Sequence, residues 1–274
     1  MSPAAASALV VDGVTKRFTT PDGALTALED VSFAVRPGEF LALIGPSGCG
    51  KSTLFNIIGG LTGGFEGQVR VDGAPIDGAH RAIGMVFQEE STFPWRTTLD
   101  NVAFPLEVAG MGKTERYARA KNLIKLVGLD GFENRYPAEL SGGMRQRTAL
   151  ARTLAAEPRI LLMDEPFAAL DEQTRLLLGD RLLQIQQALK QTTLLITHSI
   201  AEAVQLADRV VVMTYRPGRV KRVFDIDLPR PRNSEIVSSA AFGHYVAQIW
   251  NDLREEAAKG LDESEAIARR TGQH

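Results

Sequence analysis

A glycine-rich segment in the first quarter of the chain has the residue types and spacing needed to hold the phosphates of a nucleotide. The residues that match the pattern G-x-x-x-x-G-K-[ST], here called the phosphate loop, are Gly45, Pro46, Ser47, Gly48, Cys49, Gly50, Lys51 and Ser52. Glycines in such a loop let backbone N–H groups approach phosphate oxygens, and the following helix points its positive N-terminal end at the same anion. An apolar strand over 40–44 and a helix over 51–58 flank the loop as the motif requires. A glycine-rich turn without a ligand is therefore the weaker interpretation.

Two side chains of the phosphate loop could act directly on a triphosphate. The Lys51 ammonium would neutralise β- and γ-phosphate oxygens, and the Ser52 hydroxyl would ligate Mg²⁺. Cys49 occupies a variable position of the motif, and we expect it to be a bystander rather than a nucleophile. The sequence thus predicts ATP and Mg²⁺ as ligands.

Two adjacent carboxylates follow a second apolar segment. Residues 159–166 read Arg-Ile-Leu-Leu-Met-Asp-Glu-Pro, and the apolar run is typical of a buried parallel strand. We expect this strand to deliver Asp164 to the Mg²⁺ ion. Glu165, one residue further on, could polarise the attacking water as a general base. A solvated acidic pair at a strand end is the alternative, and the phosphate loop in the same chain makes it weaker.

A third motif predicts a second anion site. Residues 140–143 read Leu-Ser-Gly-Gly, and a basic helix follows them. Ser141 is a good N-cap residue, and its hydroxyl with the N–H groups of Gly142 and Gly143 would suit a phosphate at a helix N-terminus. One ATP does not need two such sites in one protomer, whereas two copies arranged head to tail would need both. A plain helix cap is the competing interpretation of these residues alone.

The elements that would position these motifs change in type along the chain. Alternating apolar and polar residues over 10–35, with turn residues at Asp12-Gly13 and at 21–23, predict antiparallel strands. From about 98 to 156 the pattern is helical, with breaks at 110–112 and 136–137. The elements expected after this insert are strands at 160–164, 194–196 and 210–214, a helix capped by Asp171 with Leu178, Leu182, Ile185 and Leu189 on one face, and a helix at 200–207. This order predicts an α/β core interrupted by a helical insert.

The last fifty residues are less informative. A Pro/Arg stretch at 228–232 reads either as an exposed linker or as a functional segment. A helix follows, and Gly260 could end it. The residues that would form its apolar face are Phe242, Val246, Ile249 and Leu253. We expect this helix to cover the core or to pack in a dimer rather than to regulate.

In their order and spacing the three motifs resemble those of the ABC (ATP-binding cassette) ATPases. The resemblance covers about residues 10–224 and implies a P-loop NTPase (RecA-like) α/β core with an antiparallel β-subdomain and an inserted α-helical subdomain that carries the signature, residues 140–143. It also implies a homodimer that sandwiches two ATP molecules. The expected boundaries are 9–224 for the ABC ATPase domain, about 92–156 for the helical subdomain and 225–274 for the tail.

Smaller elements of this family are matched one residue at a time. Gln88 matches the Q-loop glutamine, which contacts Mg²⁺ or water and links the core to the helical subdomain. Residues 168–171 match the D-loop, whose Asp171 would lie across the dimer interface, although an N-cap role explains it equally well. His198 matches the switch histidine that contacts the γ-phosphate. Phe18 lies where the family places an aromatic residue that stacks on adenine, with a core phenylalanine as the alternative.

The resemblance therefore implies the following site residues. The catalytic set comprises Glu165, His198, Gln88 and Lys51, and the metal ligands are Ser52, Gln88 and Asp164. The ATP-binding set comprises Phe18, Gly45, Pro46, Ser47, Gly48, Cys49, Gly50, Lys51, Ser52 and Thr53. Ser141, Gly142 and Gly143 would bind ATP held by the other copy. Met144 stands where many family members have glutamine, which leaves the role of that glutamine open.

A loop after Gln88 points to a membrane partner. Residues 93–96 read Phe-Pro-Trp-Arg, and exposed aromatic residues beside proline make good docking contacts. In ABC transporters this face receives a short helix of the membrane subunit, while a local packing cluster is the alternative. Together with the Pro/Arg stretch, the loop looks like the nitrate/sulfonate/taurine importer ATPases, although such an ATPase does not contact the solute.

Composition bounds the remaining possibilities. The chain carries 31 Lys and Arg against 33 Asp and Glu, and this balance gives no electrostatic case for nucleic acid. The single cysteine suits a reducing cytosol. No apolar run approaches the ~18 residues needed to span a bilayer, so a separate permease would hold the protein on the inner face of the membrane. A periplasmic or extracellular solute-binding protein would then act indirectly.

Other functions remain open at this stage. A soluble ABC ATPase that acts on DNA or ribosomes would need long coiled coils or a second ATPase unit, and neither pattern is present. An ABC exporter ATPase subunit is a further alternative. A different P-loop enzyme, such as a nucleotide kinase, would leave residues 140–143 and His198 unexplained.

Overall fold

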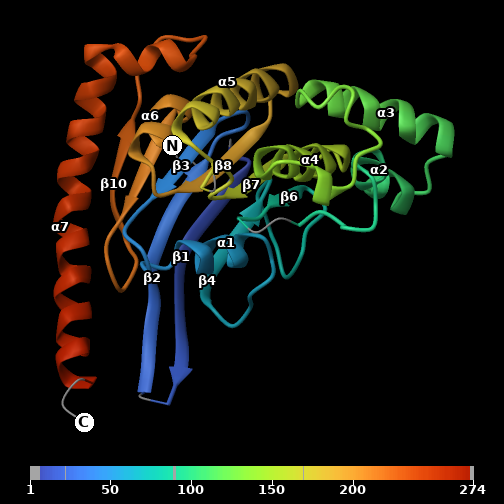
Figure 1. The fold of residues 1–274 in the computed structure, drawn as a ribbon. Coiled ribbons are helices and arrows are strands. Elements are labelled where there is room, and N and C mark those ends of the chain that lie inside the picture. Colours follow the sequence, from blue (N-terminus) through green and yellow to red (C-terminus); the bar gives the residue numbers. More distant parts are fainter. Residues whose placement is uncertain (1–6, 22, 89–90, 169, 272–274) are drawn as a thin grey trace.

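Two β-sheets organise the chain, and each collects a different part of the sequence (Figure 1). The computed structural model describes residues 7–21, 23–88, 91–168 and 170–271, with side chains as far as residue 260. One sheet has four strands and the other has six. The helices pack around the larger sheet and extend from one side of it.

The four-stranded sheet is antiparallel, as the alternating pattern predicts. It consists of β1 (Leu9–Thr20), β2 (Gly23–Val35), β4 (Glu66–Val71) and β5 (Ala74–Pro75), in the order β2-β1-β4-β5. The predicted break at Asp12-Gly13 is wrong, because β1 continues through it as a bulge between Val11 and Val14. Gly13 has φ +63°, which glycine adopts at low cost and which lets the strand bend without ending. Asp22, in the other predicted turn, lies outside the described residues.

The six-stranded sheet brings three sequence motifs to one edge. Its strands are β3 (Phe40–Ile44), β6 (Ile83–Val86), β7 (Ile160–Asp164), β8 (Thr192–Thr197), β9 (Arg209–Met213) and β10 (Val220–Asp225), in the order β10-β9-β3-β8-β7-β6. All neighbours are parallel except β10, which is antiparallel to β9. Ile44 pairs with Thr197, and Asp164 pairs with Ile196. The carboxyl ends of these strands therefore meet at the edge where ligands bind in α/β sheets.

The helices follow the predicted order. They are α1 (Lys51–Ile58), α2 (Thr98–Val108), α3 (Lys113–Leu126), α4 (Gly142–Ala155), α5 (Glu172–Leu189), α6 (Ile200–Leu206) and α7 (Ala240–Thr271), with short 3₁₀ helices at Pro137–Glu139 and Ser234–Ser238. Helices α2, α3 and α4 pack against one another as the insert between β6 and β7. The insert is less continuously helical than expected, because residues 127–136 form turns.

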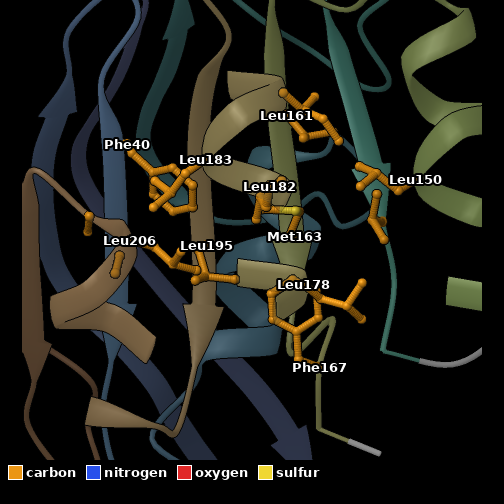
Figure 2. Packing of buried hydrophobic residues seen from close by; sticks show 14 of the residues in the cluster. Phe40, Leu150, Leu161, Met163, Phe167, Leu178, Leu182, Leu183, Leu195 and Leu206 are labelled. Carbon is orange, nitrogen blue, oxygen red and sulfur yellow. The ribbon is translucent and has the colours of Figure 1, made fainter. Parts of the chain in front are cut away.

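A core beneath the larger sheet joins the insert to the rest of the protein (Figure 2). Leu161 and Met163 of β7 and Leu195 of β8 face buried leucines of α4 and α5. Leu178, Leu182 and Ile185 are buried in it as predicted. Leu189 is 47% exposed instead, because it lies at the last turn of α5, beyond the core and beside the left-handed Lys190. Side chains of this size contribute about 1.5–3 kcal/mol each when fully buried.

Helix α7 packs on the outer side of the larger sheet beside β10 (Figure 1). Phe242, Ile249 and Leu253 are buried in the core cluster, as the predicted apolar face requires. The prediction that Gly260 ends this helix is wrong, because α7 continues to Thr271. A Cβ atom at residue 260 would lie 2.9 Å from the Tyr215 ring, so the missing side chain allows close packing and not a cap.

The Pro/Arg stretch is an internal anchor and not an exposed linker. Arg232 is 5% exposed and donates hydrogen bonds to the carbonyls of Ala207, Ile226 and Leu228. Burial lowers the pKa of Arg232 to about 10, and the nearby Arg230 adds to this effect. Three carbonyl acceptors thus hold a buried cation where the chain leaves the sheet and enters the tail.

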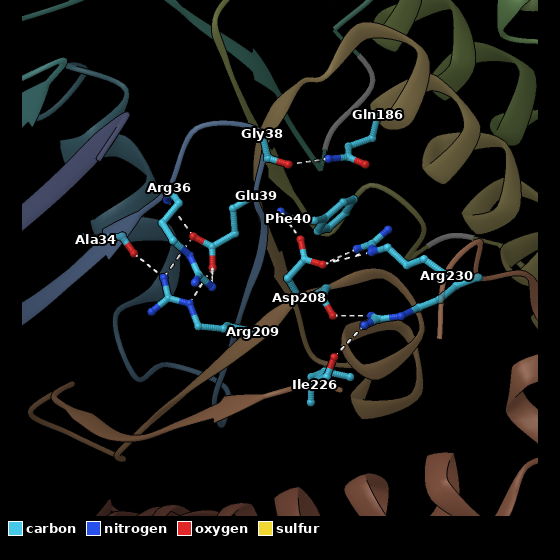
Figure 3. Close-up of polar contacts among 12 residues, drawn as sticks. Ala34, Arg36, Gly38, Glu39, Phe40, Gln186, Asp208, Arg209, Ile226 and Arg230 are labelled. Atoms are coloured by element: carbon cyan, nitrogen blue, oxygen red, sulfur yellow. Dashed lines mark hydrogen bonds and ion pairs between the residues drawn. The ribbon is translucent and has the colours of Figure 1, made fainter. Parts of the chain in front are cut away.

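Ion pairs stabilise the edge of the larger sheet at which β3 and β9 begin (Figure 3). Arg230 pairs with Asp208, whose other oxygen accepts a hydrogen bond from the Phe40 N–H at 2.9 Å. Arg209 pairs with the buried Glu39. The ends of β3 and β9 opposite the phosphate loop are therefore fixed by charge as well as by packing.

We expect Arg232→Ala to lower the free energy of unfolding by about 2–4 kcal/mol, because it leaves three buried carbonyls unpaired and removes packed side-chain atoms. Arg230→Ala is the matched control. Its ion pair is partly exposed, and its loss should cost less than about 1 kcal/mol. Urea unfolding followed by tryptophan fluorescence measures both. Equal losses for the two variants would contradict the anchoring role of Arg232.

Candidate functional site

A cavity of about 350 Å³ opens between the two sheets at the carboxyl edge of the parallel strands. The residues that line it are Phe18, Leu25, Ala27, Ser47, Gly48, Gly50, Lys51, Ser52, Thr53, Glu165 and Arg216. All except Leu25, Ala27 and Arg216 belong to the predicted site. No sequence signal indicates Arg216, because it lies more than 160 positions after the phosphate loop and outside every recognised motif.

The backbone of the phosphate loop requires glycine at two positions. Gly48 has φ +74° and Gly50 has φ +100°, values that side chains rarely tolerate. A Cβ atom at residue 50 would also lie 2.7 Å from the Leu28 side chain of β2. The loop therefore packs tightly against the antiparallel sheet at Leu28 and leads directly into α1.

Lys51 is buried although it carries a charge. Its exposure is 7%, and its ammonium donates to the carbonyls of Gly45 at 2.8 Å and Pro46 at 3.0 Å. These neutral acceptors satisfy the ammonium without neutralising it. The arrangement leaves a cation inside the loop that a phosphate group can pair with.

Gly45 and Cys49 belong to the phosphate loop, but they lie on its buried side and do not line the cavity. Cys49 is fully buried, and a Cβ atom at residue 45 would lie 2.8 Å from its sulfur. Burial raises the pKa of the Cys49 thiol, so little thiolate is present at neutral pH. The position is one of packing, in keeping with the bystander role that we expect.

Asp164 and Ser52 form an oxygen pair below the cavity. The Asp164 carboxylate is 8% exposed and accepts a hydrogen bond from the Ser52 hydroxyl. Burial raises the pKa of Asp164, the charge of Glu165 raises it further, and Ser52 and Lys51 oppose both effects. A divalent cation would relieve this desolvated carboxylate, and hydroxyl and carboxylate oxygens are the ligands Mg²⁺ prefers.

The rest of a Mg²⁺ shell would have to come from phosphate and water. Within the described part of the chain, no group of three or more His, Cys, Asp and Glu side chains could hold a metal ion. Sparse protein ligation of this kind is usual for Mg²⁺ at nucleotide sites. The residues present therefore fit a metal that arrives with a nucleotide.

Glu165 and His198 meet at the rim of the site. The Glu165 Oε2 atom lies 3.1 Å from His198 Nδ1, and the Glu165 N–H donates to the Ile196 carbonyl at 2.8 Å. Glu165 has φ +45°, which is strained for a residue with a side chain. The strain turns the carboxylate out of the line of β7 and toward the cavity. The structure thus brings together two residues that lie 33 positions apart.

A buried hydroxyl–carboxylate pair holds the segment around His198, and the sequence analysis missed it. The Thr197 hydroxyl bonds to Glu202, and Thr197 Oγ1 accepts the Ser199 N–H at 3.0 Å. Ser199 caps α6 by accepting the Glu202 N–H. The Ser-x-x-Glu spacing of 199–202 is the available signal, since it is typical of a capping box. Glu202 instead turns inward and fixes the strand residue before His198.

Gln88 lies two residues beyond the end of β6 and is exposed, and its neighbours 89–90 lie outside the described residues. The contact between core and insert is made beside it. The Gln146 side chain of α4 donates to the Phe87 carbonyl at 3.2 Å, and Thr153 donates to the Met85 carbonyl at 3.1 Å. Helix α4 is therefore hydrogen-bonded to β6 and to the residue directly before Gln88.

The signature residues lie away from the cavity. Ser141 is exposed and caps α4, accepting the Met144 N–H at 3.3 Å. The Met144 side chain packs against the core, so its own contribution is apolar. Gly143 is buried, and a Cβ atom there would lie 3.1 Å from the Leu170 side chain. None of residues 141–143 lines the cavity that holds the phosphate loop.

The D-loop ends in a helix cap. The Asp171 carboxylate accepts the Thr174 N–H at 2.9 Å and begins α5. Hydrogen bonds from Thr174 lower the pKa of Asp171, so the side chain is charged at neutral pH. Ala169, within the same motif, lies outside the described residues. The N-cap role of Asp171 is present in this chain.

The loop at 93–96 combines local packing with exposure. Phe93 stacks edge-on against Phe104 with ring centroids 4.8 Å apart, and Asn101 bonds the Phe93 and Arg96 carbonyls. Trp95 is 72% exposed on this supported loop. Among the described residues no helix is long and apolar enough to cross a membrane.

Comparison with protein families identifies the family of this chain. A model described as "ABC transporter" matches residues 28–168, which include the phosphate loop, the signature and the two carboxylates.

Several curated proteins are similar over most of their length. An uncharacterized ABC transporter ATP-binding protein of Methanocaldococcus jannaschii is 51% identical over 253 residues, covering 92% of this chain and 94% of the relative. The aliphatic sulfonates import ATP-binding protein SsuB of Bacillus cereus is 44% identical over 225 residues, with coverages of 81% and 88%. The nitrate import ATP-binding protein NrtD of Synechocystis is 41% identical over 266 residues, with coverages of 95% and 99%.

Solved structures agree with these relatives. A bacterial ABC transporter cassette, described as dimeric, has a TM-score of 0.72 and 33% identity, and covers 81% of this chain and 100% of its own. A second structure of that cassette, in a post-hydrolysis state bound to ADP and Pi, has the same TM-score, identity and coverage. The α/β fold with its helical insert is thus that of these cassettes.

Glu202 should give a distinctive pH dependence. Burial raises the pKa of its carboxyl, and its Oε1 atom has no hydrogen-bond partner among the residues that the structure describes. A raised folded-state pKa means that the folded protein binds the proton more tightly. Stability is therefore greatest below the ordinary pKa of 4.5 and falls as pH rises toward the raised value.

We expect Glu202→Gln to be more stable than the unmodified protein at pH 7–8, because the amide keeps the Thr197 hydrogen bond without a buried charge. The difference should shrink toward pH ~4.5. Glu202→Ala, which removes the acceptor, should be destabilised at both pH values. Thermal unfolding across this range provides the measurement. A glutamine variant less stable at pH 7–8 would show that the charged carboxylate is needed.

Proposed function

Because this chain belongs to the ABC transporter family and is an ATP-binding subunit with ATPase activity, we propose that it powers an importer through a separate membrane permease. The observation that carries the hydrolytic part is the placement of Glu165 at the wall of the phosphate-loop cavity, 3.1 Å from His198. The names of the sulfonate and nitrate relatives support import over export.

Each residue of the site has a separate role in ATP hydrolysis. Lys51 holds the phosphates, and Ser52 and Asp164 would hold Mg²⁺, which screens phosphate charge when bound. Glu165 is the general base for the attacking water. His198, within hydrogen-bond reach of Glu165, orients that carboxylate and contacts the γ-phosphate. Gln88 directly follows Phe87, whose carbonyl is bound by Gln146 of α4, and from this position it can couple the nucleotide site to the insert.

Each working ATP site needs two copies of the chain. The signature serine is exposed at the start of α4 and lies outside the cavity, whereas the phosphate loop lines it. A head-to-tail dimer places the signature of one copy over the cavity of the other. The similar cassette solved as a dimer supports this arrangement.

The 93–96 loop is the proposed contact with the permease. Trp95 offers a large exposed apolar surface on a loop that Asn101 and Phe104 hold in place. We place the protein on the cytoplasmic face of the membrane, bound through this loop. The named solutes of the relatives, nitrate and sulfonates, are both small oxyanions, and a solute of that class, delivered by a binding protein outside the cell, is the proposed cargo.

Glu165→Gln should bind ATP and form a stable dimer but hydrolyse ATP about 10²–10⁴-fold more slowly, since the amide cannot take a proton from water. Steady-state phosphate release and size-exclusion chromatography in ATP measure the two effects. Near-normal hydrolysis would remove Glu165 from the general-base role.

Trp95→Ala should abolish or strongly weaken copurification with the permease, while the folded state and ATP binding remain. Trp250→Ala is the control, because Trp250 is a second exposed tryptophan, 54% exposed on α7, away from this loop. Co-expression with a candidate permease from the same organism, followed by gentle detergent extraction, provides the test. Equal retention of both variants would contradict the docking role.

A further inference from the structure

The turn between β9 and β10, residues 214–219, packs directly against the phosphate loop. The Gly218 N–H donates to the Ala27 carbonyl at 3.0 Å. A Cβ atom at residue 218 would lie 2.1 Å from the Cys49 carbonyl oxygen, so only glycine allows this backbone contact. The turn is thus a wall of the nucleotide cavity that none of the recognised motifs includes.

Arg216 extends from this turn into the cavity. Its Nε donates to the Gly48 carbonyl at 2.9 Å, and its Nη2 lies 2.9 Å from where a Cβ atom of residue 48 would be. The guanidinium therefore rests on the bare face of Gly48. Across the described part of the chain, Nη1 and Nη2 make no hydrogen bond, which leaves both of these donor nitrogens available to a ligand.

The charges around the cavity favour an anion next to Arg216. Lys51 is the other cation that lines the cavity, and it is buried beneath the loop. Arg216 is exposed and contacts the same loop at Gly48, and Ser47 and Phe18 line the cavity with it. A planar guanidinium with two available donors suits the paired oxygens of a phosphate group.

Helix α7 holds the turn in position. The Tyr215 N–H donates to the buried Glu256 carboxylate at 2.9 Å, and Lys221 and Lys259 pair with the same side chain. Despite burial, hydrogen bonds from Lys259, Tyr215 and Lys221 lower the pKa of Glu256 to about 2. The anchor therefore stays charged at every physiological pH. It ties the residue before Arg216 to the tail.

We propose that Arg216 is a nucleotide-binding residue that donates hydrogen bonds to the phosphates of ATP and ADP from the side of the β9–β10 turn. This inference rests on the proposed nucleotide site and adds to it a residue outside the recognised motifs. The tail helix contributes to nucleotide affinity indirectly, because Glu256 fixes the turn.

Equilibrium titration of the full chain with MgADP and with MgATP tests the inference. Arg216→Ala and Arg216→Gln should each weaken binding by about tenfold, the range expected when a charge-assisted hydrogen bond is lost. Arg216→Lys should recover part of the affinity. Affinity should also fall less steeply with salt in the alanine variant, since one cation that contacts phosphate is gone.

Arg219→Ala is the matched control. Arg219 is an exposed arginine of the same turn that pairs with Glu29 and does not line the cavity, so its loss should leave affinity unchanged. Thermal unfolding of every variant in the absence of nucleotide reports whether the fold is intact.

The outcomes separate this inference from the proposed function. If the unmodified chain binds neither nucleotide, the nucleotide site itself is wrong. If it binds both and the Arg216→Ala variant binds equally well, the inference about Arg216 is wrong. A glutamine variant with unchanged affinity would overturn it too, because glutamine can keep the bond to Gly48 but not the charge. Weakening in both variants with partial recovery by lysine supports it.

Discussion

The rest of this structure depends on holding the backbone of the phosphate loop in a conformation that only glycine adopts easily. Gly48 and Gly50 adopt left-handed conformations, and an unsupported chain would not hold them there. The support comes from every side: Leu28 of the antiparallel sheet, the buried Lys51 ammonium, and the turn that carries Gly218. The two sheets are joined at this loop because it needs both of them.

Buried carboxylates at the two ends of the parallel strands have pKa values shifted in opposite directions. At the end opposite the phosphate loop, burial opposes ionisation of Glu39, yet hydrogen bonds from Arg209 and Arg36 hold the pKa of its carboxyl below the usual value. At the phosphate-loop end, burial raises the pKa of Asp164, and the Ser52 hydrogen bond and the Lys51 charge offset this only in part. The first end stabilises the fold. At the second end the buried charge of Asp164 is unfavourable until a cation binds there. The free energy of unfolding is therefore lowered at the place where ligands are expected to bind.

The tail is part of this scheme rather than an appendage. Arg232 anchors its start on three carbonyls, and the apolar face of α7 completes the core. Further along the helix, Glu256 holds the β9–β10 turn against the nucleotide cavity. A change in the position of α7 would therefore shift Gly48 through two hydrogen bonds, one from the Tyr215 N–H to Glu256 and one from Arg216 to the Gly48 carbonyl. These bonds couple the tail to the nucleotide cavity.

The sequence by itself located the motifs, determined most of the elements that carry them, and predicts which residues do chemistry. The spacing of residues 45–52, the carboxylate pair after an apolar strand and the cap at Ser141 each follow from local backbone needs, so a local pattern can reveal them. The same holds for the apolar face of α7. Local reasoning went wrong where a distant contact overrode it. Asp12-Gly13 is a bulge because β4 pairs with β1 on both sides of it, and Gly260 stays helical because Tyr215 packs against it.

Only the tertiary structure decided which distant residues share the cavity. Arg216 reaches Gly48, and His198 reaches Glu165, because strand order brings their segments to one edge of the sheet. Glu202 faces inward because Thr197 offers it a partner there. Pairing between strands far apart in the chain leaves little trace in local periodicity, which is why the folded arrangement alone assigns these contacts.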